Sequence, residues 1–154
     1  MKALITGVAG FVGGYLADCL NRNGWEVSAT KLKNENTAIG NTEIYDLDIL
    51  LQDEIEEVLE KVKPDCIFHL VAQSSVKLSW EKPQLTADIN IKGAINLLEA
   101  VRKKLPQTKV VLIGSGEEYG RIERVPVDEN TKPQPQNIYA VTKACQNMIG
   151  TLYS

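Results

Sequence analysis

Two polar residues near the end of the chain, Tyr139 and Lys143, have the spacing of an acid–base pair. A separation of four residues places both on one face of a helix. A tyrosine, with a reference pKa of about 10, exchanges protons poorly at neutral pH. A nearby ammonium stabilises the phenolate and brings a tyrosine into the range that general acid–base catalysis needs. The spacing therefore predicts proton transfer by Tyr139 with the help of Lys143; a core tyrosine beside a surface lysine is the alternative.

Ser115 is the third candidate catalytic residue. It follows an apolar run at residues 109–113 that is typical of a buried parallel strand. Ligands of open α/β sheets bind beyond the carboxyl ends of the strands. The Ser115 hydroxyl is therefore expected to hydrogen-bond a substrate carbonyl group next to Tyr139.

Near the other end of the chain, Gly7, Gly10 and Gly13 recur every three residues directly after a short apolar run. The first glycine permits a tight strand-to-helix turn, the second lets a pyrophosphate approach the backbone, and the third allows close helix–strand packing. The N–H groups at the helix N-terminus, where Phe11 and Val12 stand, bind the anion. The pattern predicts a dinucleotide site that includes these five residues; a glycine turn without a ligand is the alternative.

The residues after the second expected strand bear on the choice between NAD and NADP. An acidic residue about 20 positions after the glycines usually holds the ribose 2′-OH of NAD. This chain instead has Lys31 and Lys33, and its first acid there is Glu35. The positive charge predicts NADP, with Lys31 at the cofactor and NAD as the alternative. Two ordinary surface lysines would also explain the pattern.

Apolar periodicity surrounds these motifs with alternating strands and helices. Strands are expected at residues 2–6, 26–30, 43–46, 66–71 and 109–113, and helices at 11–23, 51–63, 83–104 and from 137 to the end. This alternation predicts a doubly wound parallel sheet, an α/β Rossmann fold that forms one NAD(P)-binding domain over residues 1–154. The strand at 109–113 is expected to be fully buried, and residues 120–136, with three prolines, are expected to form a long loop.

The composition excludes several classes of protein. The chain has 154 residues, a net charge of −3 and 44% hydrophobic residues, which is typical of a soluble globular domain. Its scattered basic residues give no basis for binding nucleic acid or an anionic membrane. Cys19, Cys66 and Cys145 lie too far apart for a disulfide framework or a zinc site, and the acidic run within 51–63 is typical of a solvated helix face. Asp18 and the glycines interrupt the N-terminal apolar stretch, so we expect a cytoplasmic protein without a signal peptide, membrane segment or metal.

Taken together, the motifs resemble those of the extended short-chain dehydrogenase/reductase family, which includes nucleotide-sugar epimerases, dehydratases and reductases. The resemblance covers the whole chain and rests on Thr6–Gly13, Asp48–Ile49, His69–Val76, Asn90, Ser115–Gly120 and Tyr139–Lys143. It implies that Ser115, Tyr139 and Lys143 are the catalytic set, and that Lys143 and Tyr139 also contact the cofactor at its nicotinamide end.

The same resemblance implies further cofactor contacts. Asp48 is expected to hydrogen-bond the adenine and Ile49 to pack beside it, while Leu70 and Ala72 contact the cofactor. Asn90 would be structural or would organise a water chain.

The resemblance also implies a nucleotide-sugar substrate, with Ser75, Ser115 and Glu117 as its contacts. His69, the only histidine, is expected to be a packed, hydrogen-bonded residue rather than a catalytic one. The family precedent for self-association is a homodimer that packs through the helix at 83–104 and the terminal helix.

Within the family, residues 73–80 and 114–120 are most similar to GDP-4-dehydro-6-deoxy-D-mannose reductases. This similarity implies NADPH-dependent reduction of GDP-4-dehydro-6-deoxy-D-mannose to GDP-D-rhamnose. A GDP-mannose 4,6-dehydratase or related epimerase is the alternative, because Glu117 matches the acid–base glutamate of the dehydratases. A non-catalytic dinucleotide-binding module is a further alternative, although the chain retains both Tyr139 and Lys143.

The length of the chain adds one more expectation. Members of the family continue past this point into further strands and a smaller nucleotide-sugar domain. The chain is therefore expected to be part of a larger enzyme, truncated before its C-terminal substrate domain. An exposed apolar sheet edge and weak or absent activity by itself would follow.

Overall fold

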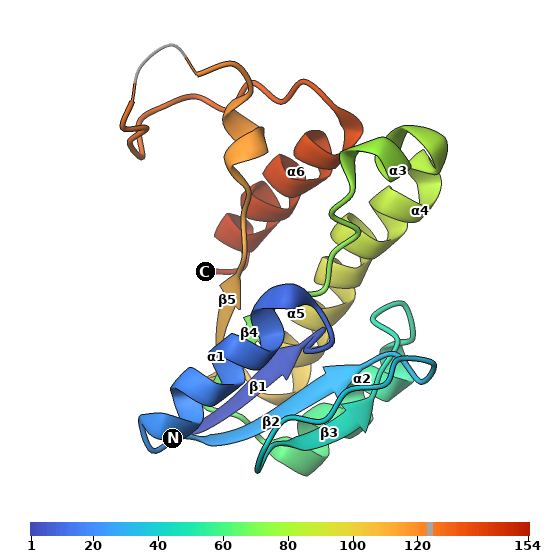
Figure 1. Cartoon of the computed structure of the whole chain (residues 1–154), viewed down its shortest axis with the longest axis vertical. Helices are drawn as coiled ribbons and strands as arrows, with labels where there is room; N and C mark the ends of the chain where they lie inside the picture. The colour runs from blue at the N-terminus through green and yellow to red at the C-terminus, as the bar shows by residue number, and fades with distance from the viewer. Residues whose placement is uncertain (123–124) are drawn as a thin grey trace.

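A computed structural model describes residues 1–122 and 125–154 of the chain. At its centre is a five-stranded parallel sheet with the strand order β3–β2–β1–β4–β5 (Figure 1). The strands are β1 (Lys2–Thr6), β2 (Glu26–Lys31), β3 (Glu43–Asp46), β4 (Cys66–His69) and β5 (Lys109–Leu112). Because β1 pairs with both β2 and β4, the chain reverses its direction of travel across the sheet at β1. A crevice at such a reversal is where open α/β sheets bind ligands.

Helices cover both faces of the sheet, which confirms the predicted doubly wound fold. The long helices are α1 (Phe11–Arg22), α2 (Gln52–Val62), α5 (Gly93–Lys104) and α6 (Ile138–Leu152). Alternate residues of β1 point to opposite faces, as a strand requires. Leu4 packs in one core cluster with residues of α2 and α5, whereas Ala3 and Ile5 pack in a second cluster with residues of α1.

The single helix expected at 83–104 has a more complex structure. Helical turns begin earlier, at α3 (Val76–Glu81), and continue through α4 (Pro83–Ala87) and a π-helical segment, η1 (Asp88–Lys92), into α5. The Asn90 side chain is fully buried in η1 and bonds both to the backbone of Gln73, at 2.8 and 3.1 Å, and to the Thr142 hydroxyl, at 2.9 Å. A π turn is a local widening that apolar periodicity does not reveal.

The expectation that the strand at 109–113 is fully buried is wrong. Val111 is 39% exposed and Ile113 is 43% exposed. Among the described residues, β5 pairs only with β4 and so forms an edge of the sheet. The expected exposed apolar edge is therefore present.

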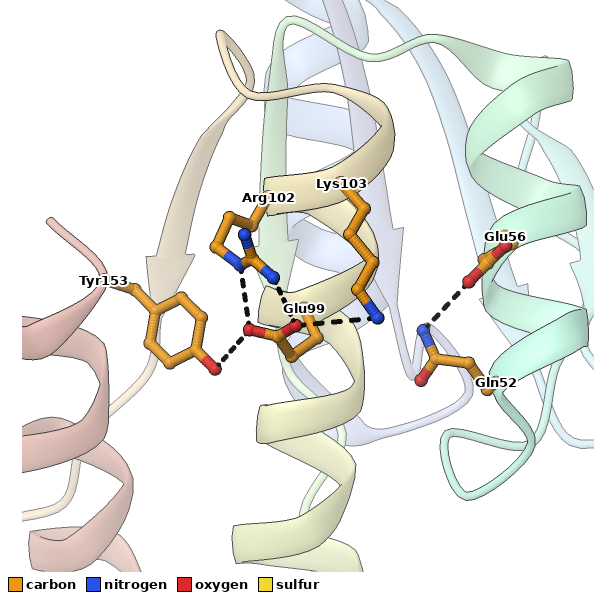
Figure 2. Close-up of polar contacts among 6 residues, drawn as sticks. All are labelled: Gln52, Glu56, Glu99, Arg102, Lys103 and Tyr153. Atoms are coloured by element: carbon orange, nitrogen blue, oxygen red, sulfur yellow. Dashed lines mark hydrogen bonds and ion pairs between the residues drawn. The ribbon is translucent and has the colours of Figure 1, made fainter.

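A polar cluster joins the end of α6 to α5 (Figure 2). Tyr153, directly after α6, donates its hydroxyl to Glu99 at 2.7 Å. The same carboxylate accepts from Arg102 at 2.8 Å and lies 3.6 Å from the Lys103 ammonium. The hydrogen bonds from Arg102 and Tyr153 lower the pKa of Glu99 to about 2. The Tyr153–Glu99 hydrogen bond thus connects the residue after α6 to α5.

Within residues 1–122 and 125–154, no helix is both long enough and apolar enough to cross a bilayer. The same residues hold no group of three or more His, Cys, Asp or Glu placed to bind a metal ion.

Candidate active site

Two of the three loop glycines are required by the fold itself. Gly7 has a φ of +77°, and a Cβ there would lie within 2.9–3.1 Å of Val71. A Cβ at Gly13 would overlap the backbone of Val8, so α1 packs against the loop only because residue 13 is glycine. Gly7 therefore has the tight-turn role predicted for it, whereas Gly13 allows close packing against Val8, in the loop after β1, rather than against the strand itself.

Gly10 differs from these two glycines. Its φ of −71° suits any residue, and the nearest atom to a Cβ there would be the Gly7 carbonyl oxygen at 3.5 Å, an ordinary contact. Neither backbone strain nor packing within the protein explains a glycine here. Gly10 is exposed and forms the N-cap of α1. A ligand that approaches the backbone closely would explain it, and the helix N-terminus suits an anion.

A cavity of about 370 Å³ opens beside this loop, at the carboxyl ends of β1, β2 and β4. Its lining brings together seven residues predicted to bind the cofactor: Gly7, Gly10, Lys31, Asp48, Ile49, Leu70 and Ala72. Sequence reasoning missed other lining residues, among them Thr30, Leu32, Glu35, Val71, Leu85 and Ile89. Leu85 and Ile89 come from α4 and η1, which only the tertiary fold brings to the cavity.

Phe11 and Val12, which the sequence also assigned to the cofactor, lie outside this lining. The Phe11 side chain is 85% exposed and stacks at a tilt on Tyr15, with ring centroids 5.5 Å apart. It borders a neighbouring hollow that shares Gly10. Contacts of Phe11 and Val12 with a cofactor stay predictions.

Lys31 lies at the predicted place but its charge is already engaged. Its ammonium is 2.6 Å from the Asp46 carboxylate, and the lysine side chain is only 17% exposed. The two residues are direct partners in the β2–β3 register. Asp46 was missed because its proximity to Lys31 depends on strand pairing rather than on spacing along the chain.

Asp48 and Ile49 reach the cavity from a turn between β3 and α2. One carboxylate oxygen of Asp48 accepts from Leu50 N at 2.9 Å, and Asp48 N donates to Glu54 at 2.7 Å. These bonds fix the turn that presents Asp48 and Ile49 to the cavity. Their contacts with an adenine remain predictions.

Tyr139 and Lys143 lie one turn apart on α6, as predicted. Asn137 caps the helix by accepting from Ala140 N at 2.8 Å. Lys143 is 3% exposed and donates to Gln146 at 2.8 Å. Burial lowers the pKa of Lys143 to about 8, against the opposing effect of the Glu118 charge. Gln146 in turn donates to the Ile113 carbonyl at 3.3 Å, which ties α6 to the end of β5.

Ser115 begins a short 3-10 helix, η2 (Gly116–Tyr119), beyond the end of β5. Its hydroxyl accepts from Glu117 N at 3.2 Å. The exposed Glu117 carboxylate accepts from Asn137 at 2.9 Å, which brings it to the start of α6. The segment that holds Ser115 and Glu117 is therefore docked onto the helix of Tyr139 and Lys143.

Glu118 is a residue that the sequence reasoning missed. It is 4% exposed, and it completes a capping box with Ser115 at the start of η2. A Ser followed three residues later by Glu is a readable sign of this motif. The spacing of Ser115 and Glu118 is therefore the sequence signal that identifies this capping box.

His69 and Ser75 have clear local contacts. The buried His69 ring bonds the Thr6 hydroxyl through Nδ1 at 2.8 Å, and burial together with the Lys143 charge lowers its pKa to about 3. The imidazole is therefore neutral at physiological pH, which suits the expected packing role. Ser75 caps α3 by accepting from Leu78 N at 3.2 Å, so its hydroxyl already has a local partner.

Known proteins share both the sequence and the fold. The family described as GDP-mannose 4,6 dehydratase matches residues 4–154. A GDP-mannose 4,6-dehydratase of Vibrio cholerae is 35% identical in an alignment 161 residues long. The alignment covers 92% of this chain and 42% of that protein. The structure of a UDP-glucose 4-epimerase from Thermotoga maritima, solved with UDP-glucose, superposes with a TM-score of 0.91 at 29% identity and covers 99% of this chain and 51% of its own.

A second epimerase, from Thermus thermophilus in complex with NAD, has a TM-score of 0.92 at 30% identity over 99% of this chain and 50% of its own. The chain thus spans about half the length of the relatives it matches. The family match and these relatives together show that the chain belongs to the GDP-mannose 4,6-dehydratase family of extended short-chain dehydrogenase/reductase enzymes.

Proposed function

We propose that this chain contributes the dinucleotide site and the catalytic side chains of an enzyme that dehydrates a nucleotide sugar, with GDP-mannose as the substrate. The observation that carries this choice is Glu117. Its exposed carboxylate is held by Asn137 at the start of α6, two residues before Tyr139. A dehydratase needs such a second acid–base group, in addition to Tyr139, to remove a proton and water from the sugar. The similarity to GDP-mannose dehydratases supports the same substrate.

The residues around the cavity fit a nicotinamide dinucleotide. Gly10 leaves its Cβ position open at a helix N-terminus, where a pyrophosphate would bind. The form we propose is NAD, because the Lys31 ammonium that would receive a 2′-phosphate is paired with Asp46. NADP, which Lys31 and Lys33 suggested in the sequence, would require Lys31 to leave that carboxylate.

Each side chain has a role in this proposal. When bound, a nicotinamide would accept a hydride from sugar C4 and return it to C6 after the C6 hydroxyl has left, so the cofactor would show no net change. Tyr139 takes the proton of the C4 hydroxyl, and Ser115 orients that oxygen. The Lys143 ammonium stabilises the phenolate of Tyr139, while Glu117 takes the C5 proton and donates it to the departing C6 hydroxyl. The proton that Tyr139 took from the C4 hydroxyl balances the one returned to C5.

The test uses the protein that contains residues 1–154, incubated with GDP-mannose and NAD. The expected product is lighter by one water, as measured by mass spectrometry, with no net change in nicotinamide absorbance. UDP-glucose in place of GDP-mannose tests epimerase activity. Persistence of dehydration in Glu117→Gln, with the rate of the unchanged protein, would exclude this role of Glu117.

Reduction of a 4-keto nucleotide sugar is the second candidate. The similarity of residues 114–120 to the reductases favours it, since Ser115 stands where the dehydratases usually have threonine. A reductase would consume NADPH in proportion to GDP-4-dehydro-6-deoxy-D-mannose. Nicotinamide absorbance followed with that keto sugar therefore separates the two reactions.

A further inference from the structure

Glu118 is a buried carboxylate at the junction between η2 and α6. It is 4% exposed, although its neighbour Glu117 is exposed. One carboxylate oxygen accepts from Ser115 N and the other from Asn147 Nδ2, both at 2.6 Å. Burial of a carboxylate costs free energy unless the group is hydrogen-bonded. The two short, charge-assisted hydrogen bonds to Glu118 offset that cost.

The two donors to Glu118 lie on the two segments that carry the candidate catalytic residues, the segment after β5 and helix α6. Ser115 is itself a candidate catalytic residue, and Asn147 lies on α6 four residues after Lys143 and eight after Tyr139. That spacing puts Asn147 on the same helix face as Lys143 and Tyr139. The single Glu118 carboxylate therefore joins the Ser115 backbone to the catalytic face of α6.

Gly114 and Gln134 also pack next to Glu118. A Cβ at Gly114 would lie 3.0 Å from both the Asn147 side-chain nitrogen and a Glu118 carboxylate oxygen. The Glu118 carbonyl accepts from Gln134 N at 2.8 Å, which also anchors the returning loop. Gly114 thus leaves room for the Glu118 carboxylate, and Gln134 holds the Glu118 backbone.

We propose that Glu118 is the positioning residue of this site, and that it sets Ser115 relative to Tyr139 and Lys143. The inference rests on the proposed function, in which these three residues act on the sugar. Glu118 itself touches neither substrate nor cofactor in this scheme.

The charge of Glu118 adds a second effect. Two titratable groups on elements packed near α6 interact electrostatically with Lys143, Glu118 from η2 and His69 from β4. His69 is neutral, whereas Glu118 raises the pKa of Lys143 against the effect of burial. Loss of the Glu118 charge should therefore lower the pKa of Lys143 further.

The test combines NMR on the protein with kinetics of the enzyme. Glu118→Gln keeps the shape, removes the charge and leaves an amide group facing one of the two donors. We expect the Ser115 amide resonance to shift and the Lys143 titration midpoint to fall, because the Glu118 charge that raises it is lost. We expect kcat to fall at least tenfold with little change in KM for the sugar. Glu129→Gln, which removes an exposed loop charge, is the matched control and should change none of these quantities.

Asn147→Ala separates the two effects and remains informative should Glu118→Gln fail to fold. It breaks one bond of the carboxylate but keeps the charge, so the Ser115 resonance should shift while the Lys143 midpoint does not fall. An unchanged Ser115 resonance in Asn147→Ala, or an unchanged kcat in a folded Glu118→Gln, overturns the proposal. If the NMR shifts occur but no sugar is turned over by the unchanged protein, the proposed function fails and the positioning contact stands.

Discussion

Replacement of Asp46 by asparagine should change the cofactor preference of the protein. The Asp46 carboxylate lies 2.6 Å from the ammonium of Lys31, which lines the proposed dinucleotide cavity. Asp46→Asn removes the negative charge but keeps the size and a carbonyl oxygen. Lys31 is then free to bind the 2′-phosphate that distinguishes NADP from NAD.

The magnitude follows from the exposure of the pair. A hydrogen bond to a charged group contributes about 1.5–3 kcal/mol. Because the Asp46 side chain is 53% exposed and solvent screens the pair, about 1–2 kcal/mol is a better expectation for the freed lysine on the phosphate. At about 1.4 kcal/mol per tenfold, NADP should bind roughly 5–30 times more tightly relative to NAD.

Isothermal titration calorimetry with NAD and NADP at one fixed salt concentration measures this ratio. The unchanged protein should prefer NAD, and Asp46→Asn should gain NADP affinity with less than about a twofold change for NAD. Glu26→Gln is the matched control, since it removes an ion-paired acid at the opposite end of β2. The double variant Lys31→Met, Asp46→Asn should lose the gain. An unchanged ratio in Asp46→Asn, or a preference of the unchanged protein for NADP, refutes the reasoning.

Three further predictions concern the glycine loop and the buried lysine. Gly10→Ala should weaken dinucleotide binding at least tenfold in calorimetry while leaving the thermal midpoint within a few degrees, since nothing in the protein crowds its Cβ; equal affinity would remove the ligand explanation of this glycine. Gly13→Ala should lower the free energy of unfolding in urea by about 1–3 kcal/mol or more, because its Cβ overlaps the Val8 backbone; unchanged stability would contradict that overlap. Lys143 has a pKa lowered from 10.5 to about 8, so the unfolded chain binds more protons between these values and stability should rise as pH rises from about 8 to 10.5. Urea unfolding across that range should show the rise, and Lys143→Met should flatten it; an equal slope in the variant would place the titration elsewhere.

The sequence predicted most of the parts whose structure is local. The glycine spacing and the helix of Tyr139 and Lys143 each depend on neighbours within a few residues, and both are present. The pairing of Lys31 with Asp46 was not predictable in this way, because it depends on the register between β2 and β3. The exposure of Val111 likewise depends on β5 lying at the edge of the sheet. Composition and periodicity describe a strand but not what lies beside it.

The two parts of the site are held by different physical means, and this difference has a consequence. Steric packing forms the glycine loop, where Gly7 and Gly13 admit no side chain against Val71 and Val8. Hydrogen bonds form the catalytic part, where Glu118 joins Ser115 to α6. A change in the Glu118 contacts should therefore alter catalysis without altering dinucleotide affinity. A change at Gly13 should instead lower the stability of the whole domain, because α1 packs on the sheet core through that contact.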